Sequence, residues 1–562
     1  MPNYHLPFAI LLFFLSFPTL RAQDRPNILW IITDDHRPDA LECYNRVKLG
    51  TNESALGYVS SPNIDGLAAE GTLFVNAYTN SPACGPSRGA LISGRYPFRT
   101  SHHAFELTHQ NPDFVRPSFP QVLREVGYAS AQFGKSGEYV YRWGPGQGFH
   151  NAAHYDYMLH FKHSLQKNGV GDLWGHSPYK MVNNKVVYQG TQEWLKRPDG
   201  TIEKYYVTKR EGSISAEDIA TRERLEKEFD VLRSYTRSNP NLIIGGRNPQ
   251  PAHQTIDAKI VDEFTAYLTH ENTDYRTSWG ATAAGANTTK PLLVNLAFHL
   301  PHTPVLPPQK FREVFKTKNY RVPEFPAEAV TNLPPQLQKL HRDLNMSRMT
   351  AEEKQQAIQD YYAFCAHGDE LIGRAVREFK AYCTRHEQEY LIVFTVGDHG
   401  WHLGEQGIEA KFGPWKQSVS NAMILVSSDK EKVPAGRVDE RLVEFVDVAP
   451  TMLSAAGVSV SDERFNYLDG IDLFQIMETE GEVRDYILGE INLVAGPRAY
   501  LRSKDFAFSM RTRPAHKTPL NRELQWALDC PVADAELALY DLRTDPGEIH
   551  NVANHPDYQK LA

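Results

Sequence analysis

The sequence predicts an α/β fold, in which a sheet of buried strands is covered by helices on both faces. Two observations lead to this prediction. Short apolar runs typical of buried strands recur along the chain, and amphipathic helical patterns lie between them. The chain has 562 residues, of which 41% are hydrophobic, and this is enough for one large core and a smaller second domain.

Four apolar runs are expected to form strands of the central sheet. Each is short and is bounded by polar or turn-forming residues, as strands buried on both faces usually are. The runs span residues 27–33 (NILWIIT), 130–134 (SAQFG), 291–298 (PLLVNLAF) and 391–397 (LIVFTVG).

Helix signals lie between and after these runs. Segment 61–71 begins with Ser-Pro, an N-cap residue followed by a proline at the first helical position, and it ends in glycine. Segment 350–383 begins with the capping box Thr-Ala-Glu-Glu and continues as a long amphipathic pattern. Segment 447–457 (DVAPTMLSAAG) is expected to be the last helix of the core.

The pattern changes at two places along the chain. Residues from about 155 to 287 are mostly polar and charged, and we expect an insertion over the sheet that forms a wall of the substrate site. Segment 498–510 (RAYLRSKDFAFSM) alternates like an antiparallel strand. We therefore expect a catalytic α/β domain over residues 24–470 and a small C-terminal α+β domain over residues 471–562.

The N-terminus has the features of a signal peptide. Residues 8–20 (FAILLFFLSFPTL) are apolar, and a cleavage site could follow Ala22. The run is too short to span a bilayer comfortably; a buried N-terminal helix or a lipid anchor is the alternative. Since no other segment reads as transmembrane, we expect residues 1–22 to direct export, so that the protein is secreted, periplasmic or attached to the cell surface.

Charge and cysteine content exclude some classes of protein. The net charge is −8 and the pI is about 6.3, so the basic surface of a nucleic-acid-binding protein is absent. An anionic substrate would need a local cluster of cations. The five cysteines are too few for a disulfide scaffold, and the four other than Cys84 could pair or stay free.

Polar residues follow each of the four predicted strands. In α/β sheets, ligands bind outside the carboxyl ends of the strands. We therefore expect three carboxylates, three histidines and a lysine at one rim of the sheet. The residues, in strand order, are Asp34 and Asp35, Lys135, His299 and His302, and Asp398 and His399.

The aspartates of this rim suggest a metal site. Asp34 and Asp35 are adjacent like charges after a buried strand, and both stay ionised at low cost only where a cation neutralises them. With Asp398 they offer an oxygen-rich site, which suits Ca²⁺ or Mg²⁺ better than zinc. The alternative for Asp34 and Asp35 is a pair of helix-capping residues.

Cys84 lies at the start of a predicted helix. In the segment 81–95 (SPACGPSRGALISGR) it precedes Pro86, which is favourable in a first helical turn. An anion is stabilised at such a helix N-terminus, and Arg88 follows about one turn later. The alternative is an ordinary buried thiol.

The run CGPSR at residues 84–88, continuing as GALISGR, resembles the signature of the type I, formylglycine-dependent sulfatases. Ser93 stands where threonine is commoner in that family. The resemblance extends over nearly the whole mature chain, including NILWIITDDHRPD, HLPHTP and LYDLRTDPGE, and segment 398–415 is most similar to the iduronate-2-sulfatase branch. It implies an alkaline-phosphatase-like fold, a large mixed-sheet sandwich with a small C-terminal α+β domain.

The resemblance also implies roles for individual residues. In that family a formylglycine-generating or sulfatase-maturating enzyme oxidises the cysteine to formylglycine (3-oxoalanine), whose hydrate is the nucleophile. Here that residue would be Cys84, oriented by Arg88. Lys135 and Lys411 would bind sulfate oxygens, and His302 and His299 would contact the sulfate or its bridging oxygen. Residue 84 would help to hold Ca²⁺ together with Asp34, Asp35, Asp398 and His399, the last of which is often asparagine in relatives.

This chemistry suits a sulfate ester. Cations aimed at the sulfate stabilise the charge that develops on its oxygens. After one hydroxyl of a geminal diol attacks sulfur, the other can collapse to the aldehyde and expel sulfate. The sequence therefore predicts a secreted sulfatase that acts on a sulfated carbohydrate, at its non-reducing end. The alternatives are a phosphoester or phosphonate hydrolase of the same fold, and a non-catalytic protein that binds sulfated glycans.

One feature departs from the family pattern. Relatives usually have a histidine two or three residues after the lysine that corresponds to Lys135, but Ser136, Gly137 and Glu138 follow here. Glu138 is either a substitute base or a solvated surface residue.

Overall fold

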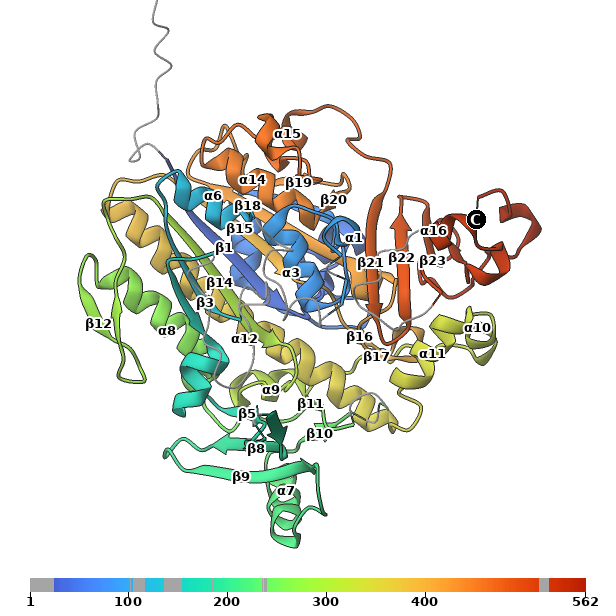
Figure 1. Ribbon diagram of the computed structural model, residues 1–562, viewed down its shortest axis with the longest axis horizontal. Coiled ribbons are helices and arrows are strands. Elements are labelled where there is room, and N and C mark those ends of the chain that lie inside the picture. The colour runs from blue at the N-terminus through green and yellow to red at the C-terminus, as the bar shows by residue number, and fades with distance from the viewer. Residues whose placement is uncertain are drawn as a thin grey trace, which may run out of the picture.

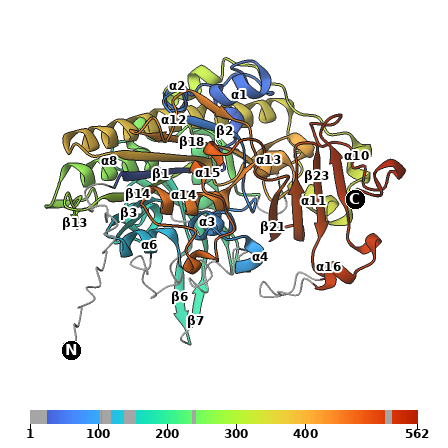
Figure 2. The same ribbon diagram turned by 90° about the horizontal axis from the view of Figure 1, so that it is seen from above.

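The computed structural model describes residues 25–101, 103–104, 117–135, 154–183, 185–234, 236, 240–514 and 525–561. A nine-stranded sheet runs through the centre of this part, in the order β19-β2-β18-β15-β1-β14-β3-β4, with β20 beside β2. Helices α8 (Ile256–Thr269) and α12 (Ala351–Arg385) cover one face, and α3 (Cys84–Ser93), α6 (Phe119–Glu125) and α14 (Val448–Ala455) cover the other (Figures 1 and 2). The predicted α/β fold is confirmed.

The sheet is mixed, but its central strands are parallel. Strands β15, β1, β14, β3 and β4 pair in parallel, so their carboxyl ends lie at one edge, whereas β18 runs antiparallel to both of its neighbours. The strands are β1 (Asn27–Asp34), β2 (Thr72–Tyr78), β3 (Ala129–Gly134), β4 (Tyr157–His160), β14 (Leu292–Pro301), β15 (Tyr390–Gly397), β18 (Ser420–Ser427), β19 (Arg437–Asp439) and β20 (Val443–Glu444).

All four predicted strands are present, and one of them is longer than expected. After a bulge in β1, the pairing with β14 continues as far as Asp34 opposite Pro301. His299 therefore lies inside β14 and not after it. Backbone pairing between strands that are distant in sequence sets this boundary, and the apolar run alone could not indicate it.

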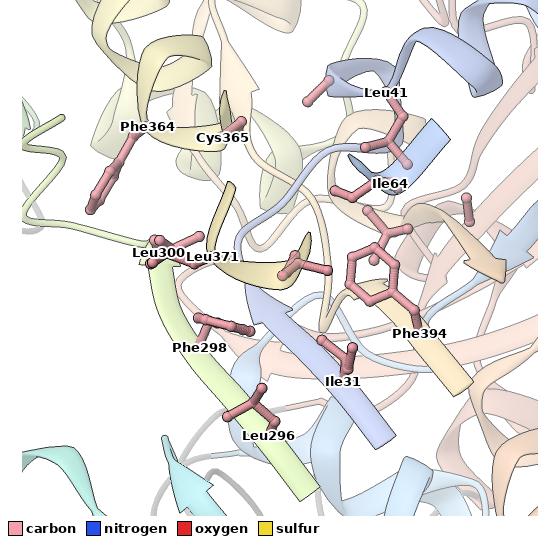
Figure 3. Packing of buried hydrophobic residues seen from close by; sticks show 14 of the residues in the cluster. Ile31, Leu41, Ile64, Leu296, Phe298, Leu300, Phe364, Cys365, Leu371 and Phe394 are labelled. Atoms are coloured by element: carbon pink, nitrogen blue, oxygen red, sulfur yellow. The ribbon is translucent and has the colours of Figure 1, made fainter. Parts of the chain in front are cut away.

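The core has two layers, one on each face of the sheet. Strand β1 shows why: Leu29 and Ile31 pack on the α12 side, whereas Ile28, Trp30 and Ile32 pack on the α14 side, and all five are fully buried. Figure 3 shows the first layer, in which Ile31, Leu296, Phe298 and Phe394 of the strands lie near Phe364, Cys365 and Leu371 of α12. In the second layer, the ring of Trp30 meets that of Phe119 edge-on at 5.4 Å.

The three predicted helices also form. They are α2 (Pro62–Ala69), α12 and α14. At the start of α12, the backbone N–H of Glu353 donates to Thr350 Oγ1 at 3.2 Å, and the Thr350 N–H donates to Glu353 Oε2 at 2.8 Å. This is the predicted capping box.

The segment expected as an insertion, residues 155–287, differs from that expectation at both ends. It begins with β4, a strand of the central sheet, and it includes α8, which packs on β3 and β14. The part that lies outside the central sandwich is smaller. It contains β5 (Leu173–His176), β8 (Gly190–Lys196), β9 (Ile202–Lys209), helix α7 (Ala216–Glu228), and the hairpin of β6 (Tyr179–Val182) and β7 (Lys185–Tyr188), which projects from the body in Figure 2.

The C-terminal region forms a separate antiparallel sheet. Its strands are β21 (Ile487–Leu493), β22 (Gly496–Arg502), β23 (Phe506–Arg511) and β24 (Ala538–Asp541). The prediction of one strand over 498–510 is wrong, because Ser503 turns the chain with an N–H bond to the Phe506 carbonyl at 2.9 Å, which makes a hairpin. Helix α15 (Leu473–Glu478) still packs in the α14 layer of the large core.

Two simpler features complete the description. Within the described residues, no helix has both the length and the apolar character needed to cross a membrane. All five cysteines carry free thiols, and four of them are buried.

Candidate active site

The carboxyl ends of β1, β3, β14 and β15 meet at one edge of the sheet, as the sequence predicts. Thr33 lies opposite Gly397, Asp34 opposite Pro301, and Gly134 opposite Ala297. The polar residues that follow each strand are therefore brought together. They are Asp34, Asp35, Lys135, His299, His302, Asp398 and His399, and all except Lys135 and His302 are buried.

Cys84 is the first residue of α3, and its side chain points into this group. Residue Ala83 is extended, and the ten residues of the helix are all buried. The sulfur lies in hydrogen-bond range of both acids and bases. Its distances are 3.2 Å to Lys411 Nζ, 3.3 Å to His399 Nε2, 3.4 Å to Asp34 Oδ1 and 3.7 Å to Lys135 Nζ.

The carboxylates around Cys84 are close enough to share one cation. One ligand atom from each of five residues lies within 4.8 Å of all the others, and the five are Asp34, Asp35, Cys84, Asp398 and His399. These are the predicted metal ligands. The buried Asp35 Oδ2 makes no hydrogen bond, and His302 Nε2 lies 3.9 Å from it.

Two lysines balance part of this negative charge. Lys135 forms an ion pair with Asp34, and Lys411 Nζ lies 2.6 Å from Asp35 Oδ1. Lys411 comes from the loop after β17 (Glu409–Ala410). Its neighbours Ala410 and Phe412 both have left-handed backbones, with φ of 95° and 79°. Such strain in residues other than glycine persists only where the surroundings impose it, and it occurs often at functional sites.

Arg88 connects the helix that carries Cys84 to three strand ends. Its Nε donates to Asp398 Oδ2 at 2.8 Å, its Nη1 to the Lys135 carbonyl at 3.0 Å, and its Nη2 to the Thr33 carbonyl at 3.5 Å. The side chain is fully buried. Arg88 therefore fixes Cys84 relative to the sheet.

The backbone around the aspartates is equally constrained. Asp35 has a φ of 63°, and its N–H donates to Asp398 Oδ1 at 3.2 Å while its carbonyl accepts from Tyr361 of α12 at 2.6 Å. A Cβ on Gly397 would lie 2.4 Å from the His36 carbonyl oxygen. Only glycine allows this close approach of the β1 and β15 ends.

Burial controls the ionisation of Cys84. It raises the pKa of the thiol to about 12, although the Lys411 ammonium opposes this change. A thiol with that pKa is protonated at neutral pH and is a poor nucleophile. The unmodified side chain therefore cannot attack an ester effectively.

Burial and neighbouring charges also shift the pKa values of the acidic and basic groups around Cys84. Burial alone would raise the pKa of Asp398, but His399, Arg88 and the two lysines outweigh it and hold that pKa low. Burial lowers the pKa of Lys135 well below its usual value. For Lys411, burial acts downward, but the charge of Asp35 raises the pKa.

The two predicted histidines are neutral and lie beside the lysines. Burial, followed by the charge of Lys135, lowers the pKa of both His299 and His302. His302 Nδ1 is 2.7 Å from the Thr303 carbonyl, so this nitrogen carries the proton and Nε2 is free to accept one. Glu138 lies outside the described residues.

The chain matches the family model for "Sulfatase" over residues 26–458. It belongs to the sulfatase family. The match covers the central sandwich and every strand end that contributes to the site, and the protein is a sulfuric ester hydrolase.

Curated relatives of this sulfatase have low sequence identity to it, but the alignments cover most of each chain. An N-acetylglucosamine-6-O-sulfatase from Bacteroides thetaiotaomicron is 24% identical over 97% of this chain and 85% of the relative. The iduronate 2-sulfatase of Mus musculus is 24% identical over 78% of this chain and 70% of the relative. An arylsulfatase from Clostridium perfringens is 23% identical over 95% and 92%.

Solved structures confirm the fold of the sulfatase. A protein in complex with its substrate, D-glucosamine-2-N,6-O-disulfate, superposes with a TM-score of 0.57 at 19% identity, covering 96% of this chain and 95% of the other. A phosphonate monoester hydrolase from Silicibacter pomeroyi has a TM-score of 0.63 at 19% identity, covering 96% and 93%. Identities this low show the shared architecture and do not separate sulfate from phosphonate chemistry.

Two residues of this sulfatase near the site were not predicted from the sequence. His160 ends β4 opposite Gly134, and Lys162 follows it in the π-helix η5 (Phe161–Leu165). The signal that could have found them is the same one that found the others, a polar residue after a strand. It was missed because β4 has only four residues and lies at the start of a polar segment.

Proposed function

We propose that this sulfatase is exported and hydrolyses sulfate esters of carbohydrates, with formylglycine formed from Cys84 and with Ca²⁺. One observation carries the proposal: Cys84 Sγ lies at a helix N-terminus within 3.7 Å of Lys135, Lys411 and His399. A tetrahedral oxyanion bound at this point would face two ammonium groups and the helix amides.

The chemistry of residue 84 supports its modification. In the structure the thiol occupies the position of the hydrated aldehyde of formylglycine. That group supplies one hydroxyl as the nucleophile and a second whose collapse releases sulfate. A pKa raised to about 12 by burial makes the thiol itself unsuitable. The proposal therefore includes an enzyme that oxidises Cys84 as a partner.

The neighbouring side chains would divide the remaining tasks. Lys135 and Lys411 would hold sulfate oxygens and stabilise the charge that develops on them. Because burial lowers the pKa of Lys135, its Nζ is also a better proton donor than an exposed lysine. His302 would accept a hydrogen bond or a proton at Nε2, and Arg88 would keep residue 84 in line with the sulfate.

The residues present fit a calcium ion. Asp34, Asp35 and Asp398 offer carboxylate oxygens within one 4.8 Å cluster, and His399 adds a nitrogen. The buried Asp35 Oδ2 lacks a hydrogen-bond donor, and a hard divalent cation would satisfy it. Bound there, the ion would supply positive charge beside the sulfate.

Metal removal provides a first prediction. Chelation of Ca²⁺ is expected to abolish sulfate release and to lower the melting temperature, because an ion that binds the native state stabilises it. The Asp398→Ala variant should show no further fall in melting temperature on chelation. Full activity and an unchanged melting temperature after chelation would contradict the calcium assignment.

The names of the relatives support a carbohydrate substrate. They include an N-acetylglucosamine-6-O-sulfatase and an iduronate 2-sulfatase, and one similar structure was solved with a disulfated glucosamine. Export is supported by the apolar run at residues 8–20. An exported enzyme would meet polymeric, sulfated sugars.

The second prediction tests this substrate class. Mature enzyme should release sulfate from a sulfated saccharide with a kcat/KM at least roughly a hundredfold above that for 4-nitrophenyl sulfate, about 2.7 kcal/mol at ~1.36 kcal/mol per decade. Mass spectrometry of the peptide that contains Cys84 should show an aldehyde in place of the thiol. Equal rates on the aryl ester would reject the carbohydrate proposal, and an intact thiol in fully active protein would reject the modification.

A phosphonate or phosphate ester hydrolase is the second candidate. The superposition on a phosphonate monoester hydrolase supports this candidate through the shared fold alone. Paired sulfate and phosphonate esters of the same alcohol separate the two. The sulfatase proposal requires the larger kcat/KM on the sulfate ester.

A further inference from the structure

The end of β4 brings an additional cation beside the proposed sulfate pocket. His160 pairs with Gly134, so the chain leaves β4 next to Lys135. The π-helix η5 begins at the following residue, Phe161, and π-helical turns are frequent at functional sites. Inside η5, Lys162 Nζ lies 5.6 Å from the centre of the Phe161 ring.

A row of rings connects this cation to the site. The Phe161 ring is 4.7 Å from that of His299, which in turn is 5.0 Å from that of His302. His302 faces Asp35. Lys162 is therefore connected to the histidines of the pocket through the Phe161 ring.

Lys162 is accessible to solvent and yet desolvated. Its side chain is exposed, and the protein around its ammonium removes enough water to lower its pKa. A ligand can therefore reach Lys162 from solvent. Its charge also lowers the pKa of Lys135 and of His299, which shows that it acts on the same site.

Lys162 differs from the other two lysines because it has no carboxylate partner among the described residues. Lys135 pairs with Asp34 and Lys411 with Asp35, but within the described part of the chain no acidic side chain forms an ion pair with Lys162. A desolvated, unpaired ammonium is unfavourable in the free protein. An anionic group of a ligand would compensate it.

We propose that Lys162 binds a second anionic group, a carboxylate or another sulfate, on the sugar that carries the reacting sulfate. This inference rests on the proposed function. Lys135 and Lys411 are within 3.7 Å of Cys84 Sγ, the place of attack, whereas Lys162 has no such contact and its Nζ lies 5.6 Å from the centre of the Phe161 ring. The buried rings of Phe161 and His299 connect the two cation positions beneath the surface.

Lys162 would thus determine specificity for a doubly charged substrate. Its contact with the second anion holds the sugar, and through it the sulfate, in register with residue 84. A charge-assisted contact to a partly desolvated ammonium is stronger than one in open solvent. The enzyme should therefore prefer a dianionic sugar to a monoanionic one that carries the same reacting sulfate.

Matched substrates and a matched variant test the proposal. One pair is D-glucosamine-2-N,6-O-disulfate and N-acetylglucosamine 6-sulfate, and the other is 2-sulfated iduronic acid methyl glycoside and its methyl ester. In the pair that wild-type enzyme hydrolyses, Lys162→Gln should lower kcat/KM at least roughly thirtyfold for the dianionic member. The factor of loss for the monoanionic member should be at least roughly tenfold smaller. Lys167→Gln, at an exposed lysine of the adjacent 3-10 helix η6 (Gln166–Asn168), should change both by less than roughly twofold.

A binding measurement separates recognition from turnover. In the inactive Cys84→Ala background, calorimetry should show that Lys162→Gln weakens binding of the dianionic sugar by a similar factor. Equal losses on both members of the pair, or unchanged binding, would overturn the role of Lys162 while leaving the sulfatase proposal intact. If wild-type enzyme releases sulfate from an aryl ester but from none of these sugars, the carbohydrate proposal itself fails, and this inference fails with it.

Discussion

Arg88 shows how much of the site depends on single buried contacts. It is fully buried and pairs with Asp398 at 2.8 Å, while it also holds carbonyls at the ends of β1 and β3. Its loss would remove the guanidinium that pairs directly with the buried Asp398. Removing one partner of a buried ion pair typically destabilises a protein by about 3–5 kcal/mol.

The third prediction follows from this contact. Arg88→Met is expected to lower the free energy of unfolding by about 3–5 kcal/mol and to abolish detectable sulfate release. Arg99→Met is the control, because Arg99 also pairs with an aspartate, Asp469 at 2.7 Å, but is half exposed. An exposed pair contributes less than about 1 kcal/mol. Urea unfolding of the two variants should separate them clearly, and equal losses would contradict the buried role of Arg88.

At the scale of an element, the turn after β15 places two predicted metal ligands. Asp398 and His399 are held between Gly397 and Gly400, and both glycines touch backbone from other segments. The Gly400 N–H donates to the Ser418 carbonyl at 3.0 Å. A Cβ on Gly400 would lie 2.0 Å from the Gln417 carbonyl oxygen, so even alanine would displace this turn.

The fourth prediction compares two glycine substitutions. Gly400→Ala should destabilise the protein and weaken or remove metal-dependent activity, because the backbone contact cannot relax without moving Asp398 and His399. Gly66→Ala, inside α2, meets nothing within 4 Å and should stabilise the fold by about 0.5–1 kcal/mol through a lower entropy of the unfolded chain. Melting temperatures and sulfate release measure both effects. A harmless Gly400→Ala would show that the turn is not constrained as described.

At the scale of the whole molecule, the C-terminal sheet supports the loops that form the site. Tyr500 of β22 donates to the Thr79 carbonyl at 2.7 Å, and the Glu490 N–H of β21 donates to the Asn80 carbonyl at 3.0 Å, just before the helix with Cys84. Arg502 pairs with Glu548 at 2.7 Å, and Glu548 accepts from the Lys416 N–H at 3.2 Å, close to the loop with Lys411. The small sheet therefore contributes to catalytic geometry although it supplies none of the predicted catalytic residues.

The fifth prediction tests this coupling. Arg502→Met should leave Glu548 buried and unpaired, lower the free energy of unfolding by about 3–5 kcal/mol, and reduce sulfate release. Unfolding followed by fluorescence and unfolding followed by loss of activity should occur in the same single transition. Lys504→Met, which removes an exposed ion pair with Glu482 at the turn between β22 and β23, should have no measurable effect on either. Loss of the sheet in a separate transition with activity retained would refute the coupling.

Much of the fold and most of the site could be predicted from the sequence. The apolar runs, the capping boxes and the glycines report on local backbone preference, so the central strands and helices were predictable to within a few residues. The rule that ligands bind at the carboxyl ends of strands then brought Asp34, Lys135 and Asp398 together. The CGPSR motif indicated the sulfatase family before any geometry was known.

Only the tertiary structure decided the features that depend on partners distant in the chain. The four residues of β4 are a strand because β3 provides their hydrogen bonds, and the same pairing places Lys162 beside the site. The turn at Ser503 divides one alternating pattern into two strands, because β24 and β21 flank the resulting hairpin. Whether a lysine has a carboxylate partner or is open to a ligand likewise depends on the residues that the fold places around it. Sequence patterns record which side chains prefer burial, whereas the partners that satisfy them are chosen by the packing of the whole chain.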